Sequence, residues 1–121
     1  MEKIGDIHLT PHFTLHELCY SDTAKFHGID NFPDWDSIVR LNELCMRLEL
    51  VRDIIKLPII VNSGFRSHKL NSLVNGSLNS YHCYGRAVDI TCSDMVSLRK
   101  AINRFDWTEK LDYGTFIHIA L

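Results

Sequence analysis

One segment constrains the fold more than any other, because residues 35–57 have the pattern of a single long amphipathic helix. Apolar residues recur there every three or four positions, which places them on one face of an α-helix. They are Ile38, Leu41, Leu44, Cys45, Leu48, Val51, Ile54 and Ile55. Asp36 is a fair N-cap, and Pro58 ends the helix because proline lacks a backbone N–H and disfavours helical geometry in the preceding residue. Such a helix needs a second layer against which its apolar face can pack.

Short β-rich segments are the natural source of that layer. Strands are predicted over residues 59–65 and 86–92, and a β-hairpin that turns at Gly114 closes the chain. This order predicts an α+β fold, in which a small antiparallel β-sheet is backed by one long core helix and several short helices. A length of 121 residues without a linker or repeat indicates a single domain, residues 1–121.

The shorter helices are predicted from their capping residues. Short helical turns are expected after Thr14 and Ser21. A helix is expected from residue 66 to about residue 74, and another after Ser93 or Asp94. The two tryptophans, Trp35 and Trp107, are expected to be packing anchors, with a role in a binding cleft as the alternative.

Charge and hydropathy exclude several classes of function. The formal net charge is −2 and no basic block is present, so no nucleic-acid partner is expected. No apolar run is long enough to cross a membrane, and the first residues lack the apolar core of a signal peptide. We therefore expect synthesis in a cytoplasm, with any exit by a route that needs no signal. The four cysteines form no C-x-x-C pair and are expected to be free thiols.

The stretch Ser80–Ile90, "SYHCYGRAVDI", contains the residues that bear most directly on function. Asp89 lies in a predicted strand and His118 in another, so the two side chains can share a sheet face if the strands pair. His82 precedes a turn at Gly85 and could lie over them. Two imidazoles and a carboxylate can hold a catalytic zinc ion. From spacing alone, a histidine and an aspartate seven residues apart are more often unrelated, and a hydrogen-bonded core histidine is the default interpretation of His118.

The same stretch matches the pattern S-x-H-x-x-G-x-A-x-D, which resembles the signature of the zinc D-Ala-D-Ala peptidases, grouped with lysostaphin-type enzymes and the hedgehog signalling domain. Upstream, "PIIVNSGFRS" and "LNSLVNGSLNS" resemble the segments that precede the metal loop in this family. Downstream, "FIHIA" resembles its last ligand strand, and residues 12–33 are similar to the opening of a branch common in phages and prophages.

This resemblance implies a set of roles. His82, Asp89 and His118 would bind Zn²⁺, and Arg66 would hold a substrate carboxylate or the developing oxyanion. Ser63 and Ser80 would shape the loops of the site and bind substrate, although Ser80 also fits an ordinary turn residue. The implied substrate is a peptidoglycan stem peptide or cross-link, cut by a carboxypeptidase or an endopeptidase. Release to the cell wall by a phage-type lysis route is one setting consistent with the missing signal peptide.

The chain departs from the family pattern at one position. Better-known members carry a carboxylate three residues before the last histidine as general base, and this chain has Thr115 there. Asp112 is the nearest carboxylate in sequence and is either the base or a solvated turn residue. Tyr113 could instead donate a hydrogen bond to the oxyanion. The departure leaves a second interpretation open, a zinc-containing module that binds cell-wall peptide or a protein without hydrolysing it.

Overall fold

The computed structural model describes residues 7–121, which contain both helices and strands. The helices are α1 (Leu15–Cys19), α2 (Asp22–Phe26), α3 (Trp35–Ile55), α4 (His68–Leu73), the 3-10 helix η2 (Tyr81–Tyr84) and α5 (Met95–Ile102). The strands are β1 (His8–Thr10), β2 (Phe13–Thr14), β3 (Ile60–Ser63), β4 (Ala87–Thr91), β5 (Glu109–Asp112) and β6 (Ile117–Ala120). Residues 1–6, for which the sequence predicts no signal-peptide core, lie outside the described part.

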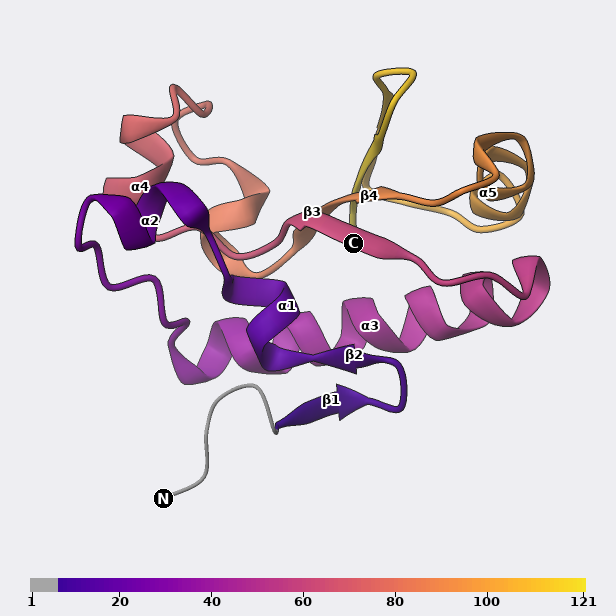
Figure 1. Cartoon of the computed structure of the whole chain (residues 1–121), viewed down its shortest axis with the longest axis horizontal. Helices are drawn as coiled ribbons and strands as arrows, with labels where there is room; N and C mark the ends of the chain where they lie inside the picture. The colour runs from indigo at the N-terminus through magenta and orange to yellow at the C-terminus, as the bar shows by residue number, and fades with distance from the viewer. Residues whose placement is uncertain (1–6) are drawn as a thin grey trace.

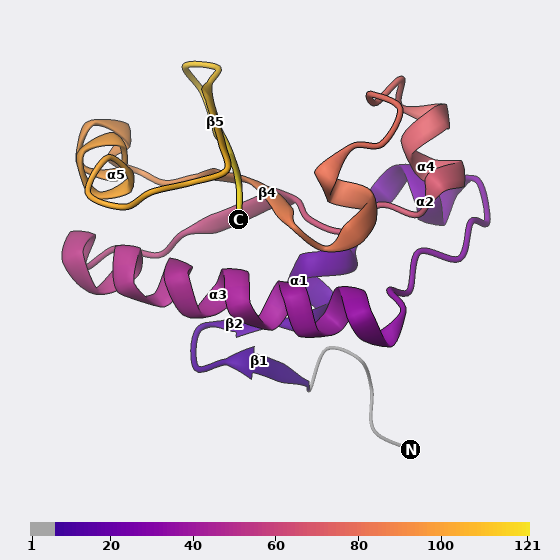
Figure 2. The same cartoon turned by 180° about the vertical axis from the view of Figure 1, so that it is seen from behind.

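Four strands form one antiparallel sheet in the order β3-β4-β6-β5. The central strands β4 and β6 are buried along nearly their whole length, whereas the edge strand β5 is mostly exposed. The hairpin β5–β6 projects from the sheet on the side away from α3 (Figures 1 and 2). The apolar core thus lies on the α3 side of the sheet, and the β5–β6 hairpin extends away from that core.

Helix α3 supplies the floor of the core. Its buried face includes Leu41, Leu44, Leu48 and Val51, all fully excluded from solvent, and these side chains belong to one apolar cluster with residues of β4 and β6. Burial of a large aliphatic side chain contributes roughly 1.5–3 kcal/mol, so this stripe is a main source of stability. The sheet lies over one face of α3 and the small β1–β2 hairpin lies on the other side (Figures 1 and 2).

The α+β fold predicted from the sequence is confirmed, with changes at its boundaries. Helix α3 ends at Ile55 because Lys56 adopts a left-handed conformation, φ 59°, two residues before Pro58. Its N-cap is Asp34, whose side chain accepts from the Ser37 amide, and not Asp36. The hairpin β1–β2 was not predicted, since its two strands are too short to show a period-two pattern.

The short helices begin where capping residues predicted them. Thr14 forms a capping box with Glu17 at the start of α1, and Ser21 caps α2. Of the two alternatives for α5, Asp94 is the N-cap. Capping side chains satisfy amide groups that would otherwise lack partners in the first helical turn, which is why these positions are readable from sequence.

The prediction that both tryptophans are packing anchors is wrong for Trp35. Its side chain is 76% exposed, because it lies two residues before the buried Ser37, on the opposite side of α3. Trp107 does pack against the core, and its Nε1 donates to the Ile102 carbonyl oxygen at 2.9 Å.

Two further expectations concern the chain as a whole. All four cysteines are free, as predicted, and all four are buried. Among the helices of residues 7–121, none combines the length and the apolar character that a membrane span requires.

Candidate metal centre

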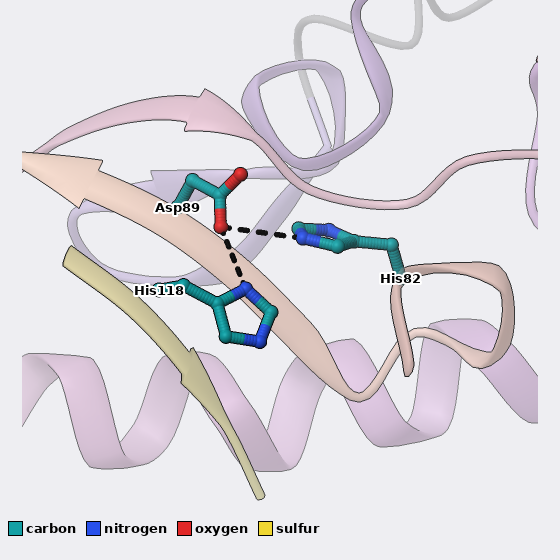
Figure 3. A group of neighbouring side chains, drawn as sticks. All are labelled: His82, Asp89 and His118. Carbon is teal, nitrogen blue, oxygen red and sulfur yellow. Dashed lines mark hydrogen bonds and ion pairs between the residues drawn. The ribbon is translucent and has the colours of Figure 1, made fainter. Parts of the chain in front are cut away.

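The strand half of the site is built by the pairing of β4 with β6. Asp89 lies directly opposite His118 in this antiparallel ladder, and directly opposed residues project from the same sheet face. His118 Nδ1 is 2.8 Å from Asp89 Oδ1 (Figure 3). The prediction that these two side chains meet on one face is therefore met in the structure.

The loop half of the site is the 3-10 helix η2, which carries His82. The Ser80 hydroxyl caps η2 by accepting from the His82 amide, at 3.2 Å. Gly85 ends η2 with φ 72°, and a Cβ at Gly85 would lie 2.4 Å from the Ser37 carbonyl oxygen. The turn therefore requires glycine both for its backbone conformation and for its close approach to α3. It aims His82 Nε2 at Asp89 Oδ1, 3.2 Å away (Figure 3).

The three side chains form a donor set that suits a divalent metal ion. One ligand atom from each of His82, Asp89 and His118 lies within 4.8 Å of the others, and all three residues are buried. Ligands of a tetrahedral zinc ion with bonds of about 2.0 Å are about 3.3 Å apart, close to the observed 2.8 and 3.2 Å separations. Two imidazoles and one carboxylate that leave a fourth position open are typical of catalytic zinc sites.

Each imidazole has a hydrogen-bond partner on its far side. His82 Nδ1 donates to the Gly64 carbonyl oxygen at 2.7 Å. His118 Nε2 is 2.5 Å from Glu109 Oε1. The remaining nitrogens, His82 Nε2 and His118 Nδ1, both face Asp89. Such outer partners fix the ring orientation of metal-binding histidines in proteins, so the rings are preorganised for an ion between them.

The buried carboxylate controls the electrostatics of the site. Burial alone would raise the pKa of Asp89, but hydrogen bonds to His118 and His82 outweigh it and leave the pKa well below its ordinary value. Burial has the opposite effect on a histidine and would lower the pKa of His118. Its hydrogen bonds to Asp89 and Glu109 outweigh burial and leave that pKa raised. Asp89 is thus an anion at neutral pH, as a metal ligand must be.

Arg66 lies beside the cluster formed by His82, Asp89 and His118, and hydrogen bonds hold its side chain in place. Its Nε donates to Ser63 Oγ at 3.3 Å and its Nη1 donates to Asn71 Oδ1 at 3.2 Å. Its Nη2 is 3.6 Å from Asp89 Oδ2. A guanidinium has five N–H donors, so donors remain for a substrate carboxylate or an oxyanion.

A cavity of about 570 Å³ opens over the cluster. The residues that line it include the three cluster residues, Arg66, Ser80, Glu109 and Tyr113. Tyr113 stacks on Phe116, with ring centroids 4.8 Å apart. The structure thus brings most of the predicted site residues to one hollow, and Tyr113 is among them.

Asp112 is the predicted residue that the structure does not bring to this hollow. Side chains alternate along β5, and the pairing of Leu111 with His118 turns residues 109, 111 and 113 toward the site. Asp112 points to the opposite face, where Arg99 Nε donates to its Oδ2 at 2.6 Å. That hydrogen bond and one from the Gly114 amide lower the pKa of Asp112. The expectation that Asp112 reaches the site is not met.

The two serines act on neighbouring residues. Ser63 accepts from Arg66, and Ser80 caps η2. Ser80 also lines the cavity over the cluster, so the substrate-binding role remains a prediction for it. The turn-residue interpretation of Ser80 is supported by its cap.

Sequence reasoning missed Glu109 and Asn71. Glu109 lies nine residues before His118, at a spacing with no motif to mark it. The signal that could have found it is the hairpin itself, because a turn at Gly114 and period-two alternation place Glu109 on the side of His118. Asn71 orients Arg66 from α4, and no local pattern distinguishes it from any other helical asparagine.

Comparison with known proteins adds two findings. The family model described as Peptidase M15 matches residues 11–120. A curated zinc D-Ala-D-Ala carboxypeptidase from Streptomyces albus G is 42% identical over 59 residues, a stretch that covers 47% of this chain and 23% of the relative. The chain therefore matches less than a quarter of that relative's length.

Proposed function

The chain belongs to the peptidase M15 family, and from that membership we propose that it is a zinc peptidase that hydrolyses peptidoglycan stem peptides or cross-links. The observation that carries the proposal is the cluster of His82, Asp89 and His118 at the base of a solvent-open cavity, with Arg66 beside it. Buried donors with preorganised rings suit the zinc that the name of the Streptomyces relative states.

Each residue of the site has a defined task in this proposal. His82, Asp89 and His118 would hold zinc, and the ion would supply Lewis-acid polarisation of a carbonyl and acidification of water. Arg66 would bind the substrate carboxylate or the oxyanion that develops at the scissile carbonyl, because a guanidinium offers paired charged donors. Tyr113, which lines the cavity, would donate a hydrogen bond from its hydroxyl group to the oxyanion.

Two measurements test the proposal. Elemental analysis is expected to give one zinc per chain in the wild type and none in Asp89→Ala. Muropeptide release from purified cell walls is expected from the wild type and is lost in His118→Ala. Zinc binding without release from several wall types would contradict the peptidase and leave the metal site intact.

A second candidate is a zinc-containing module that binds cell-wall peptide or a protein without turnover. One observation favours it: the carboxylates that line the cavity are Asp89 and Glu109, and each is hydrogen-bonded to a histidine of the cluster. Neither is a free general base on the substrate side. Retention on insoluble peptidoglycan in the absence of muropeptide release would support the module over the enzyme.

The cellular setting follows from the proposed substrate. Peptidoglycan lies outside the cytoplasm, and we propose that a phage-type lysis route carries the protein to it. The expected sign is that cells that make the protein in their cytoplasm lyse when a membrane-permeabilising agent is added and do not lyse without it. Lysis without permeabilisation would contradict the need for such a route.

A further inference from the structure

Glu109 contacts the cluster from a strand that carries no metal ligand. It lies on the edge strand β5, opposite Ala120, which is two residues from His118. Such diagonal neighbours share a sheet face and are within reach of long side chains. Glu109 uses this reach to place Oε1 2.5 Å from His118 Nε2. The side chain of Glu109 is 41% exposed and that of His118 only 11%, so the bond lies at the cavity wall.

The position of this carboxylate selects one tautomer of His118. A metal ion takes the lone pair of one imidazole nitrogen, so the proton of the neutral ring must sit on the other nitrogen. His118 Nδ1 faces Asp89 and His118 Nε2 faces Glu109. A carboxylate oxygen can only accept, and it therefore holds the proton on Nε2 and leaves the Nδ1 lone pair for the metal.

The outer hydrogen-bond partner of the other histidine is a different kind of group. His82 donates from Nδ1 to a backbone carbonyl, that of Gly64. The backbone there is fixed, since a Cβ at Gly64 would lie 2.2 Å from the Leu18 carbonyl oxygen. The partner of His82 is thus part of the fold, whereas the partner of His118 is one side chain that a single substitution can remove.

We infer that Glu109 is a positioning residue for the metal, which orients His118 and increases its strength as a zinc ligand. The inference rests on the zinc site of the proposed function but not on peptide turnover. Glu109 Oε1 lies on the far side of the imidazole from Nδ1, so the ring of His118 separates this oxygen from the metal position. Glu109 consequently acts through His118 and is not placed to take a proton from a water molecule at the metal.

The test is the zinc affinity of the full chain, measured by competition with a chromophoric chelator. Removal of an outer partner of a metal-binding histidine costs about 10- to 100-fold in metal affinity. We expect a loss of that size in Glu109→Ala and a smaller loss in Glu109→Gln, whose amide oxygen still accepts but carries no charge. Circular dichroism of each variant is the control for correct folding.

The chain offers a matched control in a second histidine–glutamate pair. His12 Nδ1 is 2.6 Å from Glu49 Oε1, with no further metal-binding side chain of residues 7–121 grouped beside it. Glu49→Ala is expected to bind zinc within twofold of the wild type. A general effect of losing a surface carboxylate would weaken zinc equally in the Glu49 and Glu109 variants and would overturn the inference.

A spectroscopic readout separates orientation from simple loss of charge. In the zinc-loaded, 15N-histidine-labelled wild type, the Nε2 proton of His118 should be seen as a slowly exchanging signal. It should persist in Glu109→Gln and be lost or exchange faster in Glu109→Ala. Unchanged zinc affinity in Glu109→Ala overturns the inference and leaves the peptidase untouched. Weakened zinc affinity in a protein without muropeptide release supports the inference while the peptidase fails.

Discussion

The cluster draws its ligands from two regions that are held in different ways. Asp89 and His118 sit on paired central strands, where backbone hydrogen bonds of the ladder fix their separation. His82 sits on a four-residue 3-10 helix, positioned by the Ser80 cap and the Gly85 turn. A ladder distributes its stability over many bonds, whereas a short turn depends on a few contacts. The strand region is therefore expected to tolerate substitutions that the loop region does not.

The largest effect is expected from Gly85→Ala, which acts on the loop region. An alanine at φ 72° costs about 1–2 kcal/mol in backbone conformation, and its Cβ would collide with the Ser37 carbonyl oxygen. We expect a loss of at least about 2 kcal/mol in the free energy of unfolding and loss of stoichiometric zinc as His82 shifts. Chemical denaturation and elemental analysis measure the two effects.

Gly114→Ala is the matched control in the strand region. Gly114 also has a positive φ, 86°, but nothing lies within 4 Å of the added Cβ. It should cost only the conformational term, about 1–2 kcal/mol, and keep one zinc per chain. Equal zinc loss in both variants would show that the two regions are not independent.

The next effect is expected from Arg66→Lys, at the junction of the two regions. The Arg66 amide donates to the His82 carbonyl oxygen at 3.1 Å, while its side chain faces Asp89. Lysine keeps the charge but loses the planar fork, and loss of an oxyanion donor costs about 100- to 1000-fold in kcat. We expect a fall of about tenfold or more in kcat per bound zinc, with zinc stoichiometry unchanged.

Arg47→Lys is the control for that substitution. Arg47 donates to the Asp106 carbonyl oxygen and lies over the rings of Phe105 and Trp107, on the α3 side of the molecule. Its replacement should leave kcat per zinc within twofold. A similar fall in both variants would indicate a loss of stability and not a role of Arg66 in the reaction.

The two regions also differ in how far the sequence predicts them. The strand region follows from period-two alternation, which places Asp89 and His118 on one face once the strands pair, and the same rule would have found Glu109. Position along a turn has no such rule. The place of His82 over the sheet depends on the close approach of Gly85 to Ser37, 48 residues earlier in the chain. From the residues alone, the turn at Gly85 made this place of His82 one possibility among others, and the family resemblance then implied that His82 is a ligand.

The same alternation explains the two outcomes near the hairpin turn. Asp112 is the last residue of β5 and Tyr113 follows it directly, so their side chains point to opposite sides of the hairpin. Tyr113 faces the cavity and Asp112 faces α5, where Arg99 binds it. The number of residues between each of them and His118 does not show which of the two faces the cavity. The position of each residue relative to the turn does show this, because the turn sets the register of a hairpin.

A smaller effect on folding stability is expected from a change of pH, and it arises from Asp89 and His118 in the strand region. In the zinc-free protein the pKa of His118 is raised, chiefly because hydrogen bonds to Asp89 and Glu109 outweigh burial. Its stabilising contribution is fully present below the unfolded pKa of about 6.5 and is lost as pH rises through the higher folded pKa. The pKa of Asp89 is lowered, so its contribution is lost only as pH falls below about 4.

Zinc reverses the first of these trends. Zinc must displace the proton from His118 Nδ1, so its affinity should rise by up to about tenfold per pH unit below the folded pKa. Thermal unfolding with and without zinc is expected to show a larger stabilisation at about pH 8 than at about pH 6. A zinc-induced shift in Tm that does not change over this range would contradict the proton-for-metal exchange at His118.

The smallest effect is expected from Asp112→Asn, on the far face of β5. Its hydrogen bond from Arg99 is solvent-exposed, and exposed ion pairs contribute little. Zinc stoichiometry should be unchanged and muropeptide release should stay within twofold of the wild type. Glu109→Gln, three residues earlier and on the near face, is the paired comparison, since the same loss of one charge should there weaken zinc binding. A loss of activity above tenfold in Asp112→Asn would mean that the hairpin turns its other face to the substrate, and would restore Asp112 as the general base.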